Sequence, residues 1–302
     1  MQTMKNVTYE SYKEFYKKCN SVVVANKSIF LPKKWKISEF EPSVNDLKTN
    51  TTIWSFPDRG SWATHRGNYR GNWSPYIPRC LILKYTEKGD LVLDPMVGSG
   101  TTLVECKLLE RNAIGVDINP DAIIISRNRL DFEYNPNVNY QEPQIQTYIG
   151  DAMHLDLIES NSVDLVTLHP PYADIIVYTQ DLTEKDMSQI HDIDEFAKTI
   201  QNVAAESFRV LKPGKVCAIL VGDTRRKSHY VPLSTRVMQC FLESGFILKE
   251  NIIKHQWNTS GYKFWNQKSN NFHLIAHEHL FVFKKPKDKN ELQKCRESTK
   301  WW

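Results

Sequence analysis

Short apolar runs alternate with amphipathic stretches over most of the chain beyond about residue 75. Apolar runs of strand length occupy residues 91–93, 113–116, 163–168 and 215–221. Apolar residues at helical spacing follow each run, beginning near Thr101, Asn119, Asp194 and Leu233. This order is typical of an α/β fold, namely a doubly wound, mostly parallel sheet covered by helices. Ligands of such sheets bind at the carboxyl ends of the strands.

The C-terminal part departs from this alternation. Residues 247–255 and 274–283 have the pattern of strands, and the loop between them is polar and aromatic with no helical spacing. This predicts an antiparallel C-terminal hairpin at the edge of the sheet. Residues 286–302 are charged and predict a poorly ordered tail.

The N-terminal part is polar and rich in Lys and Asn, with weak periodicity. It predicts a basic arm over residues 1–60, with one helix around 9–18 and otherwise irregular chain. Between the arm and the C-terminal tail, residues 61–285 are expected to form the main domain.

Composition narrows the protein class. The chain has 302 residues, and no apolar run approaches the ~18 residues that a membrane helix needs. No apolar stretch follows the first residues to serve as a secretion signal. The six cysteines include no CxxC pair, so neither a disulfide framework nor a zinc site is expected. Together these features indicate a protein of the reducing cytoplasm.

The net charge of +4 is unevenly placed, because basic residues gather in the first 80 positions. Many lysines lie in the first forty residues, and arginines then mix with aromatic residues over 54–79. The mixed stretch contains Trp54, Arg59, Trp62, His65, Arg66, Tyr69, Arg70, Trp73, Tyr76 and Arg79. Cations neutralise phosphates and rings stack on bases, so the mixture suits a nucleic-acid surface. A merely solubilising face is the alternative.

A loop with two glycines follows the first strand of the alternating region. Asp94 ends the strand, and Gly98 and Gly100 allow close approach of a ligand just before a helix begins at Thr101. The free N–H groups of that helix N-terminus suit a carboxylate. A phosphate-binding P-loop is excluded because the required Lys is missing, and a dinucleotide loop lacks its third glycine.

Two further acids lie at the ends of the following strands. Asp117 is placed to accept from ribose hydroxyls, and Asp151, in Gly150-Asp151-Ala152, could accept from an adenine amino group. The alternative is that these residues are only turn glycines and capping acids. As a set, they predict a nucleoside-binding edge of the sheet.

The loop Asp94-Pro95-Met96-Val97-Gly98-Ser99-Gly100-Thr101-Thr102 and the later string Gly115-Val116-Asp117-Ile118-Asn119-Pro120 carry a resemblance. They resemble the first two cofactor motifs of the amino-methylating DNA methyltransferases, the N6-adenine and N4-cytosine enzymes. Residues 71–78, which include Trp73, resemble a further cofactor motif of that family. The resemblance covers roughly residues 60–285.

The resemblance implies a Rossmann-like class I methyltransferase fold, S-adenosylmethionine as cofactor and no metal. It also implies a set of cofactor-binding residues. They are Asp94, Pro95, Met96, Gly98, Ser99, Gly100, Thr101, Thr102, Asp117, Ile118, Asn119, Asp151, Ala152 and Trp73.

The tetrapeptide His169-Pro170-Pro171-Tyr172 follows the strand at 163–168 and resembles the family's catalytic signature. The two prolines fix the backbone and remove donors, which leaves rigid carbonyl oxygens to accept from a base amino group. Such acceptors make the amino nitrogen more nucleophilic and align it for methyl transfer. Tyr172 would stack on a base flipped out of the double helix.

His169 departs from the signature, whose first residue is Asp, Asn or Ser. A neutral imidazole can accept a hydrogen bond from the target amine, and a protonated one cannot. The hypothesis that His169 accepts therefore predicts a loss of turnover below about pH 6. In the alternative, His169 only orients the loop and the Pro170 carbonyl makes the contact.

The sequence thus predicts a site-specific DNA methyltransferase, as in restriction–modification systems, acting on duplex DNA with the base flipped. N4 of cytosine is slightly favoured over N6 of adenine. The absence of an obvious recognition domain suggests a homodimer or a separate specificity subunit. Expected nucleic-acid contacts are Arg66, Arg70, Arg225, Arg226, Lys227 and Lys263.

Several alternatives stay open at this point. An RNA amino-methyltransferase, such as a tRNA guanine-N2 enzyme, shares the Pro-Pro-Tyr loop, as does a protein glutamine methyltransferase. A catalytically idle methyltransferase fold acting as a DNA-binding subunit is the non-enzymatic reading, and His169 is its best support.

Overall fold

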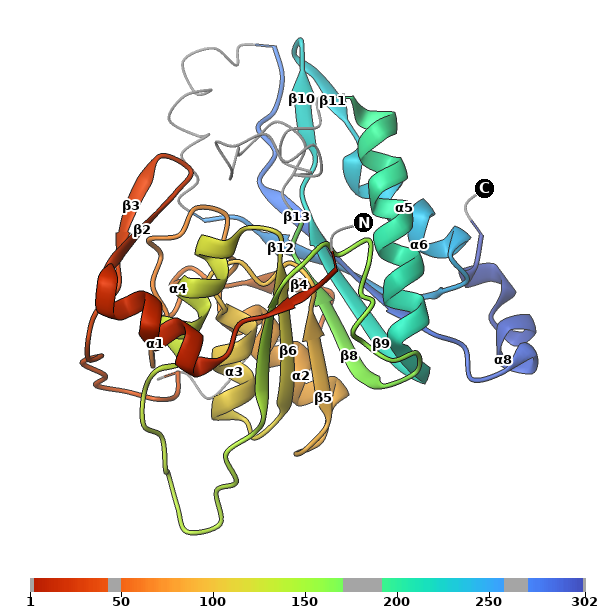
Figure 1. Cartoon of the computed structure of the whole chain (residues 1–302). Helices are drawn as coiled ribbons and strands as arrows, with labels where there is room; N and C mark the ends of the chain where they lie inside the picture. Colours follow the sequence, from red (N-terminus) through yellow and green to blue (C-terminus); the bar gives the residue numbers. More distant parts are fainter. Residues whose placement is uncertain (1–2, 43–49, 171–191, 258–270, 301–302) are drawn as a thin grey trace.

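A computed structural model of the chain describes residues 3–42, 50–170, 192–257 and 271–300. Within these residues lies a nine-stranded sheet with the order β1-β7-β6-β5-β8-β9-β13-β12-β4 (Figure 1). In that order the strands are Lys5–Asn6, Ile145–Ile149, Asn112–Asp117, Leu91–Asp94, Val163–Leu168, Leu211–Val221, His277–Lys284, Ile247–His255 and Ile53–Ser55. The five strands from β7 to β9 are parallel, which confirms the doubly wound α/β sheet of a Rossmann-like methyltransferase fold.

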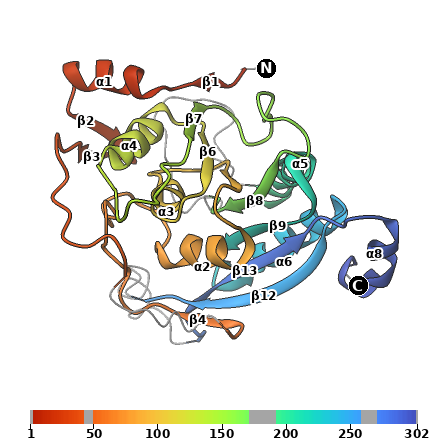
Figure 2. The same ribbon diagram turned by 90° about the horizontal axis from the view of Figure 1, so that it is seen from below.

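Helices cover both faces of the sheet. They are α1 (Tyr9–Lys18), α2 (Tyr76–Tyr85), α3 (Thr101–Leu108), α4 (Pro120–Leu130), α5 (Ile193–Val210) and α6 (Leu233–Glu243). Alternate residues of a strand face opposite sides, so Val92 on β5 packs with α2 and α3 while its neighbour Leu93 packs with α5 and α6. Leu165 and Val166 on β8 divide in the same way. Figure 2 shows α2 and α3 on one face and α5 on the other.

The C-terminal hairpin is confirmed, with one difference. β12 and β13 pair antiparallel, but β13 lies inside the sheet between β9 and β12. β12 consequently runs in the same direction as β9 and pairs in parallel with β4, which forms the edge. β4 is three residues long, too short to stand out in the sequence, and it is anchored by Trp54, which is buried.

The prediction of a helix in the N-terminal arm is confirmed, and that of irregular chain after it is wrong. Thr8 caps α1 by accepting from the Ser11 N–H, and Tyr12 is buried against α4. The arm also adds β1 at one edge of the sheet, β4 at the other, and the separate hairpin β2 (Ser21–Val24)–β3 (Lys27–Phe30). These strands of two to four residues carry too little periodicity to be predicted.

Two smaller differences concern helix ends. α5 was expected to begin near Asp194, and it begins after Asp192, whose carboxylate accepts from the N–H groups of Asp194 and Glu195. The expected disordered tail contains helix α8 (Lys289–Lys294), capped by Asp288, and a 3-10 turn at Arg296–Ser298. Among the described residues no helix is both long and apolar enough to cross a membrane.

The basic and aromatic stretch 54–79 is mostly buried, which corrects its reading as a nucleic-acid surface. Its centre is the carboxylate of Glu105 on α3, which is inaccessible to solvent. Glu105 accepts from Trp62 Nε1 at 2.7 Å and Arg79 Nη1 at 2.9 Å, and its Oε1 lies 2.7 Å from His65 Nε2. Of the arginines in this stretch, which the structure describes in full, only Arg66 and Arg70 are exposed.

Replacing Glu105 by alanine should destabilise the protein by about 3–5 kcal/mol, because Arg79 would keep a buried charge without its partner. The free energy of unfolding in urea measures this. Glu87→Ala, which removes an exposed acid, should change it by less than about 0.5 kcal/mol. Equal effects of the two substitutions would contradict a structural role for Glu105.

Candidate active site

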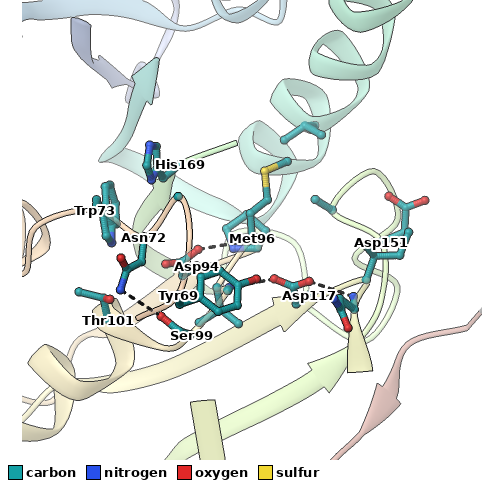
Figure 3. A pocket seen from close by; sticks show the side chains of 18 of the residues that line it. Tyr69, Asn72, Trp73, Asp94, Met96, Ser99, Thr101, Asp117, Asp151 and His169 are labelled. Atoms are coloured by element: carbon teal, nitrogen blue, oxygen red, sulfur yellow. Dashed lines mark hydrogen bonds between the residues drawn. The ribbon is translucent and has the colours of Figure 1, made fainter. Parts of the chain in front are cut away.

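The carboxyl ends of four parallel strands open into one pocket. Asp94 and Asp117 are the last residues of β5 and β6, Asp151 comes two residues after β7, and His169 follows β8. The space is about 860 Å³, counting its open mouth. Figure 3 shows Asp117 and Asp151 at one end of the pocket, and His169 beside Trp73 at the other, with Asp94 between them.

Nearly all residues expected to bind the cofactor come together here. The pocket is lined by Asp94, Pro95, Met96, Gly98, Ser99, Thr101, Asp117, Ile118, Asn119, Asp151, Ala152 and Trp73. Gly100 and Thr102 do not line it, and they support the loop from behind. The Thr102 hydroxyl donates to Asp94, and Gly100 caps α3 with φ +82°. A Cβ at Gly100 would lie 2.8 Å from Ser126 Oγ and 3.0 Å from its Cα. Only a glycine at this position therefore lets the loop lie so close to α4.

Burial dominates the electrostatics of Asp94. Its side chain is 3% exposed, and burial raises its pKa to about 7, with the negative charge of Asp117 acting in the same direction. Hydrogen bonds from Thr102 and from the Met96 N–H oppose this rise. A cation placed in the pocket would favour the ionised form of this carboxyl.

Asp117 and Asp151 are oriented by backbone N–H groups. Asp117 accepts from Gly98 at 2.8 Å with one oxygen and from Asn119 at 2.9 Å with the other. It therefore links the glycine loop to the start of α4. Asp151 accepts from the Met153 N–H at 2.9 Å. Both carboxylates line the same end of the pocket.

His169 is held by a ring that comes from far away in the sequence. Its imidazole stacks on Trp73, with ring centroids 5.5 Å apart and planes 11° from parallel. Burial lowers the pKa of His169 to about 4, so its imidazole is neutral at neutral pH. The predicted cofactor motif around Trp73 and the predicted catalytic tetrapeptide thus meet. Pro170 is buried, and Pro171 and Tyr172 lie outside the described residues.

The expected nucleic-acid contacts differ in their surroundings. Arg66 is exposed and lies over the Trp35 ring at 5.1 Å, and Arg70 and Lys227 are exposed. Arg225 is engaged within the protein, since its guanidinium donates to the carbonyls of His273 and Ser228 and lies over Phe272. Arg226 lies beside it in strand β10 (Thr224–Arg226) and is partly buried, and Lys263 is outside the described residues.

The sequence of the chain matches the family profile described as DNA methylase over residues 3–128 and 163–301. The chain belongs to this DNA methylase family. The match extends beyond residues 60–285, over which the resemblance was expected, and takes in most of the N-terminal arm and the C-terminal tail. Because strands of the arm lie at both edges of the sheet, this extent agrees with the fold.

Curated proteins match this chain over about a third of its length or less. The Type II methyltransferase M.HpaI of Haemophilus parainfluenzae is 51% identical over 95 residues, 31% of this chain and 30% of that protein. The Type II methyltransferase M2.MboI of Moraxella bovis is 36% identical over 86 residues, 28% of this chain and 32% of that protein. The matches thus span about a third of these relatives' length.

Two other comparisons reach beyond the Type II enzymes. The tRNA (guanine(10)-N2)-dimethyltransferase of Methanothermobacter thermautotrophicus is 31% identical over 105 residues, 34% of this chain and 29% of that protein. The solved structure of a SAM-dependent methyltransferase from Methanosarcina mazei covers 69% of this chain and 98% of its own, with a TM-score of 0.47 and 15% identity.

Sequence reasoning missed a buried arginine behind the glycine loop that follows β5. Arg129, on α4, is 2% exposed and donates to Ser99 Oγ at 2.7 Å and to Asn68 Oδ1 at 2.9 Å. Ser99 also accepts from Asn72 at 3.4 Å, a pocket residue. Burial lowers the pKa of Arg129 to about 9, and within the described chain it forms no ion pair. No local signal distinguishes it from other basic residues near a helix end.

Proposed function

We propose that this DNA methylase transfers a methyl group from S-adenosylmethionine to an exocyclic amino group of a DNA base. One observation carries the proposal. A single pocket joins the acids at the ends of β5, β6 and β7 to the stacked pair His169–Trp73 after β8. A cofactor held by the acids would therefore reach the tetrapeptide that resembles the family's catalytic signature.

The chemistry of the lining fits this cofactor group by group. Asp117 would accept from the ribose hydroxyls and Asp151 from the adenine amino group. Asp94 would face the positive charges of the methionine part. The carboxylate of the methionine part would lie at the N-terminus of α3, where Ser99 and the buried positive charge of Arg129 lie behind it. Thr101 Oγ1, at the first turn of α3, is buried in the pocket wall without a hydrogen-bond partner among the described residues, as expected of a ligand-binding hydroxyl.

The reacting end relies on acceptors. When bound, S-adenosylmethionine supplies an electrophilic methyl group. The neutral imidazole of His169 would accept one hydrogen bond from the target amine and the Pro170 carbonyl another, which exposes the nitrogen lone pair. The amine proton released by transfer would pass to water or through His169. Pro171 and the stacking role of Tyr172 stay predictions from the sequence, and no metal takes part in the proposed reaction.

Two pH limits should separate the two ends of the pocket. Turnover at saturating cofactor should stay level from about pH 8 to about pH 5, because burial lowers the pKa of His169 to about 4 and its imidazole stays neutral. This replaces the fall below about pH 6 expected from an ordinary histidine. Cofactor affinity should weaken below about pH 7, because the raised pKa of Asp94 lets it protonate there and lose its negative charge.

Rate profiles and calorimetric titrations over this range measure the two limits. A turnover midpoint near pH 6 would show that His169 titrates as an exposed histidine and is not buried at the reacting end. If cofactor affinity is independent of pH, Asp94 does not contact the positively charged part of the cofactor. A level rate profile does not separate acceptance by His169 from acceptance by the Pro170 carbonyl, for which a substitution is needed.

The finer points of substrate remain proposals. N4 of cytosine is slightly favoured over N6 of adenine, but His169 does not decide between them, since it can accept from either amine. Duplex DNA with the base flipped, and a homodimer or specificity subunit, follow from family likeness and the small recognition elements. The similarity to the tRNA guanine-N2 enzyme keeps RNA as the second candidate.

Incubation of the full chain with methyl-labelled cofactor and either duplex DNA or tRNA, followed by nucleoside mass spectrometry, tests the proposal. We expect labelled N4-methylcytosine or N6-methyladenine in the DNA. Labelled N2-methylguanosine from tRNA alone would establish the RNA alternative. Cofactor binding by calorimetry without transfer to either nucleic acid would favour an idle, DNA-binding subunit.

A further inference from the structure

A cluster of metal-ligating side chains lies outside the pocket. Asp223 comes two residues after β9, and His277 and His279 begin β13, which pairs with β9 so that His279 is opposite Val221. One ligand atom from each of the three side chains lies within 4.8 Å of the others. None of them lines the proposed active site, although β9 is the neighbour of β8, which leads to His169.

Asp223 is fixed by donors that leave it facing the histidines. Its Oδ1 accepts from the Ser234 N–H at 2.7 Å, and its Oδ2 accepts from the hydroxyls of Ser234 at 2.9 Å and Tyr230. The side chain is 2% exposed. The carboxylate is therefore held at the base of the hairpin formed by β10 (Thr224–Arg226) and β11 (His229–Val231).

His279 presents an acceptor, not a donor, to this carboxylate. Its Nδ1 lies 3.1 Å from Asn251 Oδ1, which can only accept, so the ring proton belongs on Nδ1. Nε2 then carries a lone pair and lies 3.7 Å from Asp223 Oδ2. The lone pair of His279 Nε2 and the carboxylate oxygen of Asp223 thus face each other where solvent is partly excluded. They repel each other, and a cation between them would be attracted by both.

His277 supplies the third atom because residues two apart on a strand point to the same face. Its ring centroid lies 5.2 Å from that of His279. Two imidazoles and a carboxylate are a ligand set that zinc and similar divalent metals take. The Asn251 contact is also the kind of outer partner that orients a metal-bound histidine through its second nitrogen.

We propose that Asp223, His277 and His279 bind one divalent transition-metal ion of the Zn²⁺ class. The ion ties the base of the β10–β11 hairpin to β13, next to the catalytic edge of the sheet. The three ligand atoms would draw together by about 1 Å to reach metal–ligand distances of about 2.0–2.2 Å. The fourth position of the ion is then open to water, and the site is separate from the proposed methyl transfer.

Titration of the metal-stripped full chain with Co²⁺ and Zn²⁺, without cofactor or nucleic acid, tests the site. We expect one ion per chain, a Co²⁺ absorption spectrum typical of nitrogen and oxygen ligands, and a higher unfolding temperature with Zn²⁺. His277→Ala and His279→Ala should each remove the spectrum and the thermal shift. Asn251→Ala leaves all three ligands and should weaken metal binding by about 10- to 100-fold.

His229→Ala is the matched control, because His229 is an exposed histidine on the same hairpin. It should bind metal like the unmodified chain. Absence of stoichiometric binding at about 100 µM Co²⁺ or Zn²⁺ would overturn the proposal. So would binding that survives both His277→Ala and His279→Ala, or that His229→Ala reduces as much as they do. None of these outcomes depends on methyl transfer, so the metal site and the proposed activity are tested independently of each other.

Discussion

Replacing His169 by alanine should reduce methyl transfer by about 10²- to 10⁴-fold while cofactor affinity changes by less than about threefold. The imidazole lies at the end of the pocket away from Asp117 and Asp151, so its loss leaves in place the acids that are proposed to bind the cofactor. The reaction would lose a neutral acceptor for the target amine. Single-turnover rates with labelled cofactor measure the first quantity, and calorimetry measures the second.

His169→Asn is the informative companion substitution. An amide oxygen can accept the same hydrogen bond, but the stack on Trp73 is lost. If His169 accepts from the amine, the asparagine variant should recover most of the rate that alanine loses. If His169 only orients the loop and the Pro170 carbonyl accepts, both variants should lose the rate to a similar extent. A fully active alanine variant would remove His169 from the reaction altogether.

The positions of the acids could be predicted from the sequence because they depend on local patterns. Asp94, Asp117 and Asp151 each follow an apolar run, and parallel strands bring their carboxyl ends to one edge. No long-range knowledge is needed beyond the direction of the strands. For the same reason the glycine loop and the start of α3 were predicted close to their observed places.

The burial of the basic and aromatic stretch 54–79 could not be predicted, because it depends on Glu105, which is distant in the sequence. Trp62, His65 and Arg79 are buried around Glu105, which in the sequence is one acid in an amphipathic helix. Clustered cations near aromatic rings have the same local pattern whether they face DNA or a buried carboxylate. The difference arises only when this stretch packs on α3.

The properties of His169 likewise come from tertiary structure. Its neighbours in sequence predict a catalytic loop, but the lowered pKa comes from burial beside Trp73, 96 residues earlier. A strand pairing likewise brings Asp223 and His279 together from distant parts of the sequence. Sequence pattern thus predicted which residues line the pocket, and packing determines the protonation of His169.

Asp117→Ala should abolish measurable binding of S-adenosylmethionine, with a loss of affinity of at least about 100-fold. A carboxylate that accepts from ribose hydroxyls contributes about 1.5–3 kcal/mol for each charged hydrogen bond. Its removal also leaves the N–H groups of Gly98 and Asn119 without their acceptor, which frees the glycine loop from the start of α4. Calorimetric titration of the full chain measures the loss.

Asp121→Ala provides the control, because this acid lies in the first turn of α4 and does not line the pocket. It should bind the cofactor within about threefold of the unmodified protein. Asp117→Asn keeps one acceptor oxygen and should lie between the two, since it can satisfy one of the two backbone N–H groups at most. Cofactor affinity that survives Asp117→Ala would place the ribose elsewhere and would contradict the proposed orientation, with the nucleoside at Asp117 and the methyl group toward His169.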